Sequence, residues 1–240
     1  MKKLLLATAA AAPLLAMANL ASAADLGVRA AAAPAPVVPV YTWTGLYVGG
    51  GWGYGMYNLD TQATSTLAPF GVSQTLGGRG WLGTVTAGGD YQLNNWLVIG
   101  AFGDYDWANI KNNGANPVFG TIKENSAWAV GGRAGYAVTP AFLTYFDAGF
   151  TQARFSTSAG LIPSHNYSGW FIGSGFDTRL SGLLSSWLGL GPGWYWRTEY
   201  RFSEFQSASF TSVPAVATAS VRPFVQTVRT EIIYKFNSGL

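Results

Sequence analysis

Hydrophobic and polar residues alternate with a period of two along most of the chain after Gly45. Between residues 45 and 57, Leu46, Val48, Trp52 and Tyr54 occupy one set of alternate positions, and the other set is mostly glycine. A helix would mix these two sets around its circumference, whereas a strand separates them onto two faces. The pattern therefore predicts β-strands that each carry one apolar face.

The alternation recurs along the chain and defines a series of predicted strands. They cover residues 45–57, 80–93, 96–107, 125–138, 142–153, 167–180, 194–205 and 222–236. Short connections at 94–95 and 139–141 alternate with longer segments rich in Ser, Thr, Asn and Gly at 58–79, 108–124, 154–166 and 206–221. Short turns at one end and long loops at the other are typical of bacterial transmembrane barrels. We expect an all-β fold, an eight-stranded antiparallel transmembrane β-barrel.

The composition supports strands in a membrane. Only 10% of the 240 residues are charged and 15% are aromatic, whereas soluble domains carry about 25% charged residues. Beyond the N-terminus no apolar run approaches the roughly 20 residues that a spanning helix needs. A soluble ligand-binding barrel would place apolar side chains inside and polar ones outside, which is the reverse of the pattern here.

The N-terminal residues have the features of an export signal. Lys2 and Lys3 precede an apolar stretch, and Ala21-Ser22-Ala23 is a small-residue cleavage site. We therefore predict a signal peptide at residues 1–23, cleaved after Ala23, an Ala/Pro-rich periplasmic lead at 24–43, and a barrel at 44–240. Without Lys2 and Lys3 the chain is close to neutral, which argues against a nucleic-acid partner.

Charges of both signs recur on the faces opposite the apolar ones. In a barrel this narrow, side chains fill the bore. Because burying a charge without a partner costs much free energy, we expect these groups to pair with one another. The sequence predicts a salt-bridged plug, and the alternatives are a polar conduit for small solutes or a proton relay. The predicted interior charges are Asp104, Arg133, Asp147, Asp177, Arg179, Arg197, Glu199, Arg201, Arg229 and Glu231.

Little in the chain indicates catalysis. There is no cysteine and one histidine, so no disulfide, thiolate nucleophile, metal site or cofactor is expected. His165 lies near Ser164 and Ser168, which leaves open a lipid-modifying or haem-binding role, but the polarity of a loop explains these residues equally well. We predict that the protein is not an enzyme.

Tryptophans cluster near the ends of the predicted strands. Indole rings favour the headgroup level of a bilayer, and a transmembrane barrel carries an aromatic girdle at each interface. The predicted girdle residues are Trp43, Trp81, Trp96, Trp107, Trp128, Trp170, Trp194 and Trp196.

An ordered set of short motifs accompanies this pattern. The segment 41–50 (YTWTGLYVGG) follows the Ala/Pro-rich lead, and 88–91 (GGDY), 99–104 (IGAFGD), 133–136 (RAGY), 173–177 (GSGFD), 197–200 (RTEY) and 233–236 (IYKF) follow in order. Together they resemble the small outer-membrane barrels of alphaproteobacteria, the porin-family or outer-membrane immunogenic proteins with an OmpA-like transmembrane barrel.

The resemblance implies a place in the bacterial outer membrane, with loops exposed as a surface antigen and a structural or surface-interaction role; the alternative is a small or oligomeric porin. It also implies outer-membrane lipid and lipopolysaccharide as partners, and an assembly machinery that recognises Tyr234 and Phe236 near the C-terminus. Association into a homo-oligomer stays open. So does the role of the apolar segment 183–190, which either lies in the inner interface or extends the neighbouring strands.

Overall fold

The structure is a computed structural model that describes residues 42–65, 71–112, 120–158, 164–180, 186, 189–211 and 217–236. The predicted signal peptide, the lead up to residue 41, most of the segment 183–190 and the residues after Phe236 lie outside the described residues. Within the described residues, no helix has both the length and the apolar character that crossing a bilayer requires.

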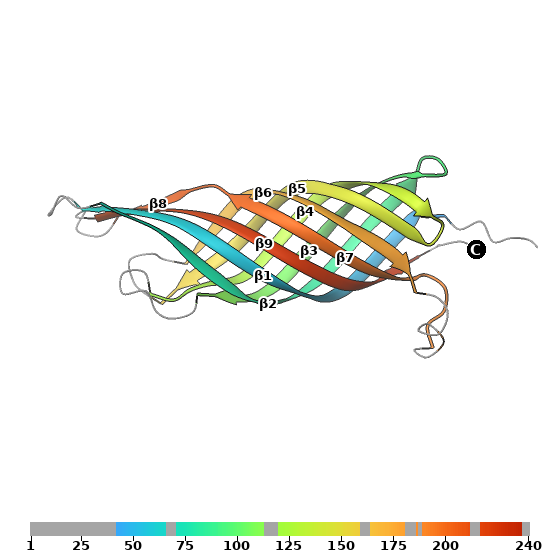
Figure 1. Ribbon diagram of the computed structural model, residues 1–240, viewed down its shortest axis with the longest axis horizontal. Coiled ribbons are helices and arrows are strands. Elements are labelled where there is room, and N and C mark those ends of the chain that lie inside the picture. The colour runs from blue at the N-terminus through green and yellow to red at the C-terminus, as the bar shows by residue number, and fades with distance from the viewer. Residues whose placement is uncertain are drawn as a thin grey trace, which may run out of the picture. The chain divides into compact units, whose positions relative to one another are not determined.

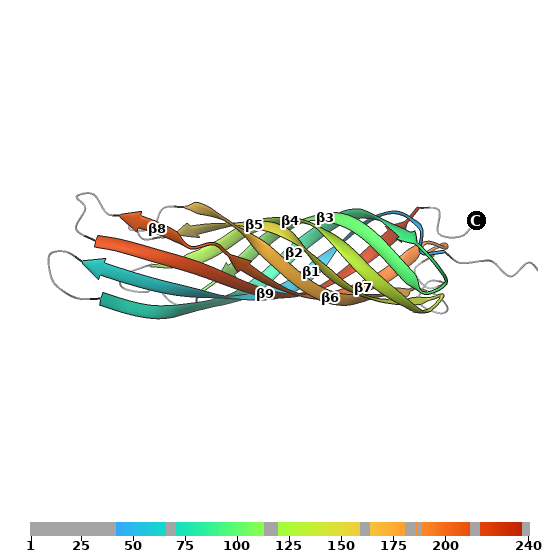
Figure 2. The same cartoon turned by 90° about the horizontal axis from the view of Figure 1, so that it is seen from above.

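The described chain is almost entirely strand. Every strand is antiparallel to its neighbours in one sheet, and the sheet closes because the first strand pairs with the last. Figures 1 and 2 show the strands inclined to the barrel axis and wound around it. The strands are β1 (Gly45–Ser65), β2 (Gly71–Gln92), β3 (Leu97–Lys111), β4 (Ile122–Thr139), β5 (Phe142–Thr157), β6 (His165–Arg179), β7 (Trp194–Phe205), β8 (Ala208–Thr211) and β9 (Ala217–Lys235).

Strands β7 and β8 together make one wall element of the barrel. The pairing of β7 with β9 ends at Glu204 and Phe224, and β8 resumes it at Ala208 and Val221. Pro223, which has no N–H to donate, lies in β9 at this interruption, as prolines within sheets commonly do. The nine strands therefore form an eight-stranded barrel, which confirms the predicted fold class.

The strands extend further at one end than the alternation predicts. β1 continues to Ser65 and β2 begins at Gly71, so most of the predicted loop 58–79 is strand, and the other three long loops are also shorter than predicted. The outward-facing residues in these extensions, such as Gln62 and Thr64, are polar. The alternation disappears there because an outer face beyond the lipid contacts water, while the backbone pairing continues. Figures 1 and 2 show that β1, β2, β8 and β9 project furthest.

The side chains point in the directions that the alternation predicts. Val85, Ile99 and Val130 are 43–49% exposed on the outside, whereas Arg133 and Glu199 are buried inside. Leu180 is an exception: the alternation of the predicted strand 167–180 places it on the same outward face as Trp170 and Ile172, but it is buried. It follows the last residue of β6, Arg179, so the strand geometry that would direct it outward has ended.

The interior has three zones along the barrel axis. On β3 and β7, buried charged residues lie between an apolar cluster toward one end and an apolar, aromatic cluster toward the other. The first cluster fills the end where β1 finishes and β2 starts, which we call the external end, and includes Tyr57, Leu59, Ile110, Phe155 and Val225. The second fills the opposite end, where β1 starts and β9 finishes, which we call the periplasmic end, and includes Trp43, Tyr47, Leu143, Tyr195 and Ile233. The predicted polar interior therefore describes only the middle zone.

Inward-facing glycines let β1 and β9 approach closely. A Cβ added to Gly51 would overlap the carbonyl oxygen of Thr230 and lie 2.7 Å from the Cα of Glu231. A Cβ on the outward-facing Gly83 would have its nearest neighbour at 4.0 Å. Gly51 is therefore needed for this close approach, whereas Gly83 has space around it.

We predict that Gly51→Val destabilises the folded barrel by about 1–3 kcal/mol, as overpacking of a tight interior does. Gly83→Val is the matched control on the paired strand, and it should leave stability unchanged or slightly raised because valine favours strands. Urea unfolding of the refolded protein in detergent, followed by tryptophan fluorescence, measures both. Equal stability of the two variants would contradict the close packing of β1 against β9.

Candidate functional site

Five buried residues from five strands form an ion-pair network toward the periplasmic end. The Asp177 carboxylate accepts hydrogen bonds from Arg197 Nε at 2.7 Å and from Arg133 Nη2 at 3.3 Å. Asp90 forms ion pairs with Arg133 and with Lys235. We call Asp90, Arg133, Asp177, Arg197 and Lys235 the periplasmic network.

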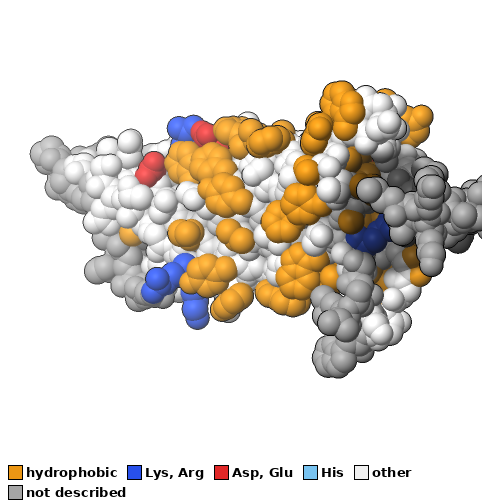
Figure 3. Space-filling model, turned by 45° about the vertical axis from the view of Figure 1, so that its right-hand side comes forward, with side chains coloured by type: hydrophobic (Ala, Val, Ile, Leu, Met, Phe, Trp, Pro, Cys, Tyr) orange, Lys and Arg blue, Asp and Glu red, His pale blue; other side chains and the backbone are white. Residues whose placement is uncertain are grey.

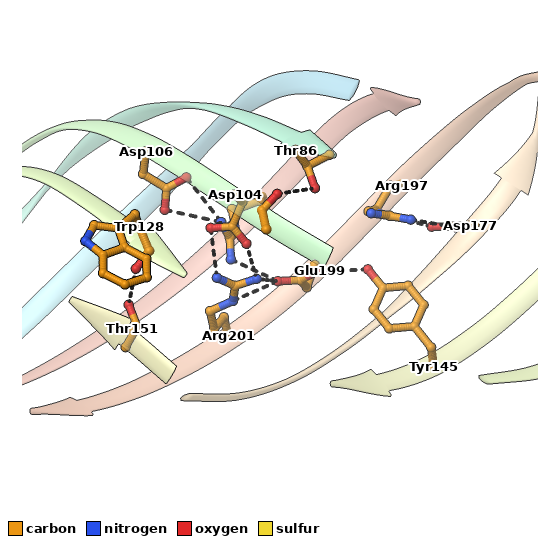
Figure 4. Close-up of polar contacts among 12 residues, drawn as sticks. Thr86, Asp104, Asp106, Trp128, Tyr145, Thr151, Asp177, Arg197, Glu199 and Arg201 are labelled. Atoms are coloured by element: carbon orange, nitrogen blue, oxygen red, sulfur yellow. Dashed lines mark hydrogen bonds and ion pairs between the residues drawn. The ribbon is translucent and has the colours of Figure 1, made fainter. Parts of the chain in front are cut away.

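A second set of five residues, the central network, crosses the bore beside the first. Arg201 donates to Asp104 at 2.7 Å and to Glu199 at 3.0 Å. Arg229 reaches Asp104 and Asp106 at 3.2 Å and Glu199 at 3.0 Å. Figure 4 shows these side chains converging from several strands. Because each arginine contacts at least two carboxylates, no single pair carries the arrangement.

Tyr145 connects the two networks. Its hydroxyl donates a hydrogen bond to Glu199 Oε2 at 3.0 Å. The guanidinium groups of Arg133 and Arg197 lie over its ring, 4.9 and 5.5 Å from the centroid. The periplasmic network has more cations than anions and the central network has more anions than cations, so their opposite excess charges lie next to each other across this tyrosine.

The remaining predicted interior charges also lie inside but are less well paired. Asp147 is buried opposite Arg133 on the neighbouring strand, and neither of its carboxylate oxygens has a hydrogen-bond partner in the described part of the barrel. Glu231 is buried opposite Arg197, and Arg179, nearer the periplasmic end, donates to the Tyr195 hydroxyl at 2.9 Å.

Sequence reasoning left three network members out of the candidate set. Asp90, Asp106 and Lys235 are as buried as the predicted residues and take part in the ion pairs. The alternation places all three on the inward faces of their predicted strands, and their burial confirms that facing. Glu124, also buried, fell in a predicted loop that the structure shows to be strand.

Trp43 does not belong to the aromatic girdle. It is 2% exposed and lies inside the periplasmic end, with its ring 5.1 Å from that of Tyr195 and the Lys235 ammonium 4.7 Å above it. Its backbone N–H donates to Gln92 Oε1 at 2.8 Å. Trp43 precedes β1, so it is not bound by the strand alternation and turns into the bore.

The other predicted girdle tryptophans lie on the outer surface in two groups. One group lies toward the external end and consists of Trp81, Trp107, Trp128 and Trp170. The other lies toward the periplasmic end and consists of Trp96, Trp194 and Trp196. Tyr234 and Phe236 also face outward at the periplasmic end, with ring centroids 5.1 Å apart. Figure 3 shows the band of hydrophobic side chains on one face.

The geometry offers little for catalysis or metal binding. His165 is the first residue of β6 rather than a loop residue, and its ring packs against Tyr167 and Phe210 at 4.9 and 5.3 Å. The Ser168 hydroxyl accepts a hydrogen bond from Gln152 at 3.0 Å. No cluster of three or more metal-ligating side chains occurs among the described residues.

The comparison with known families agrees with this architecture. A family model described as "Outer membrane protein beta-barrel domain" matches residues 7–222. The chain belongs to this family. It is thus a bacterial outer-membrane β-barrel protein, as its lipid-facing apolar surface requires.

Several similar proteins come from alphaproteobacteria. The 25 kDa outer-membrane immunogenic protein of Brucella canis is 27% identical, with 85% of this chain and 84% of that protein covered. The 31 kDa outer-membrane immunogenic protein of Brucella melitensis biotype 1 is 27% identical, with 98% and 100% covered. The crystal structure of OprG from Pseudomonas aeruginosa has a TM-score of 0.51 at 10% identity, covering 82% of this chain and 99% of that one, which shows a shared fold.

We predict that Arg229→Met destabilises the barrel by about 3–5 kcal/mol, because it leaves buried carboxylates uncompensated. Arg222→Met is the matched control: Arg222 is 51% exposed and pairs with Glu204 on the outer surface, where such pairs contribute under about 1 kcal/mol. Denaturant unfolding in detergent micelles measures both. If Arg229→Met lowered the free energy of unfolding no more than Arg222→Met does, the central network would not be stabilising.

Proposed function

We propose that this protein is a closed, non-catalytic barrel that presents an interaction surface at its external end. The filled bore carries this proposal. Side chains of both networks, among them Asp104, Arg133 and Glu199, leave about 210 Å³ of space between their atoms, and no part of it is wide enough for a water molecule. Apolar clusters fill the bore on both sides of the charged zone. A continuous aqueous path would need all three zones to rearrange.

The external end supports a role in recognition. β2 pairs with β3 only from Arg79 onward, so its first residues, 71–78, pair with β1 alone among the described strands. β8 pairs only with β9. Apart from Gln74, the residues along these two edges face no second strand among the described residues, and strand edges of this kind can receive an extended segment of a partner. The Brucella relatives are named immunogenic proteins, which agrees with a surface that other molecules contact.

Assembly into the membrane is proposed to depend on Tyr234 and Phe236. Both rings project outward from the periplasmic end of β9, and Tyr234 also contacts Trp194 at 5.0 Å. An assembly machinery that binds the last strand would meet these aromatic side chains first.

In planar bilayers we predict conductance far below that of a general porin, because the ion-paired bore has no room for hydrated ions. Single-channel recording on the refolded protein measures this, with heat-modifiable gel migration confirming that the barrel is folded. Large, stable channels whose ion selectivity changes in Arg197→Gln would show that the bore conducts, and the alternative of a small pore would replace this proposal.

His165→Ala should leave the lipid composition of the outer membrane unchanged, because the imidazole packs edge-on against the rings of Tyr167 and Phe210. Mass spectrometry of lipids from cells that produce wild-type or variant protein measures the effect, and cells without the protein are the reference. A lipid modification that appears with the wild type and disappears in the variant would establish an enzyme.

A further inference from the structure

Three basic side chains form an unbroken row across three neighbouring strands on the outer surface. Arg79 on β2 is directly opposite Lys111 on β3, and Lys111 is directly opposite Lys123 on β4. Arg79 and Lys111 are exposed, and Lys123 is partly exposed. Like charges directly opposite one another on adjacent strands destabilise a sheet, so the row is unfavourable for the isolated barrel. We call Arg79, Lys111 and Lys123 the basic row.

The described part of the barrel places no acidic side chain in an ion pair with the basic row. None of its members has an ion-pair partner among the described residues, in contrast to Arg222, which pairs with Glu204. Glu204 and Asp60 are the outward-facing acidic residues of the described strands. Asp60 lies opposite Thr75, four positions along β2 from Arg79. Arg154 on β5 adds a further exposed cation on the Lys123 side. Among the described residues, every charged side chain that faces outward at this end of β2 to β5 is therefore basic.

The position of the row relative to the girdle indicates what would neutralise it. On the same three strands, Trp81, Trp107 and Trp128 lie next to the row on its membrane side, two to five residues away. Such tryptophans mark the headgroup level of a bilayer. At about 3.3 Å per residue along a strand, the cations lie within the reach of lipid phosphates in the outer leaflet. On the face shown in Figure 3, Lys and Arg side chains adjoin the hydrophobic band near its left-hand end.

A hollow on the outer surface adjoins the row. It has a volume of about 310 Å³ and is lined by Met56, Asn58, Gly77, Arg79 and Lys111, among others. Gly77 faces outward, so its missing side chain leaves the space open. A Cβ there would have ordinary contacts at 3.7 and 3.8 Å, so the fold does not require glycine at this position. The hollow offers two cations and one apolar side chain next to the lipid surface.

We propose that the basic row and the adjoining hollow bind the phosphate groups of a phosphorylated lipid of the outer leaflet, with its acyl chains lying on the apolar surface below Trp81 and Trp107. The bound phosphates offset the repulsion within the row, so the lipid stabilises this side of the barrel. This inference rests on the outer-membrane location and is independent of whether the bore conducts.

The decisive experiment compares the wild type with the triple variant Arg79→Gln/Lys111→Gln/Lys123→Gln, refolded in zwitterionic detergent. The probes are diphosphoryl lipid A and the same lipid with its phosphates removed, titrated against tryptophan fluorescence. Each cation near a membrane surface is worth about a fivefold change in affinity, so the triple variant should bind diphosphoryl lipid A roughly 100-fold more weakly. Removing the phosphates should weaken binding to the wild type similarly and barely affect the variant.

A second readout separates lipid binding from misfolding. Without lipid, the triple variant should be at least as stable to denaturant as the wild type because its like-charge contacts are gone, and only the wild type should gain stability from diphosphoryl lipid A. Gly77→Leu keeps every charge but fills the hollow, and it should weaken binding as well. The matched controls are Gly83→Leu, also outward and unobstructed, and Arg222→Gln, and both should bind normally.

Several results would overturn the proposal. One is equal binding of phosphorylated and dephosphorylated lipid by the wild type. Another is full competition by inorganic phosphate at the same concentration, which would indicate a site for free anions. Loss of binding to a soluble sulfated polysaccharide in the triple variant, with lipid A binding intact, would assign the row to a polyanionic partner outside the membrane.

Discussion

The rest of this structure depends on one constraint: charges inside a narrow barrel surrounded by lipid have one another as their main partners. Breaking a buried pair leaves a charge that no solvent compensates, which costs far more than the pair itself contributes. The two networks meet this constraint by sharing, since Arg133, Arg201 and Arg229 each contact more than one carboxylate. The result is a set of cross-bore contacts that link strands β2, β3, β4, β6, β7 and β9 to one another independently of the backbone ladder.

Charge is distributed in opposite ways inside and outside the barrel. Most acidic side chains of the described strands point inward, where they neutralise arginines, whereas the outer surface of β2 to β5 at the external end is basic. The alternation of the strands makes this separation possible, because adjacent residues such as Lys123 and Glu124 lie on opposite faces. The same geometry thus gives the chain an interior whose charges neutralise one another and an outer surface whose positive charge is neutralised by the membrane.

The fold and the facing of its residues could be predicted from sequence because they depend on local periodicity. The opposite facing of Val130 and Arg133 follows from their positions on one strand. The choice of partners could not be predicted, because Arg201 and Asp104 are 97 residues apart and meet only through the stagger of the closed barrel. The apolar external cluster was missed because Tyr57 and Leu59 lie where the outer face becomes polar. Trp43 was misplaced because it lies outside any strand and follows no alternation.

The unequal lengths of the strands have a consequence for how the barrel forms. The contact between the first and last strands extends from Tyr47 and Lys235 to Ser65 and Ala217, and it is among the longest ladders in the sheet. It joins the first and last strands of the barrel, which are far apart in the sequence, and contacts of such long range form slowly. Until this ladder forms, the facing edges of β1 and β9 lack their strand partner. During insertion, the unpaired edges of β1 and β9 therefore need to be shielded from other strands more than they would in a barrel with a short closing ladder.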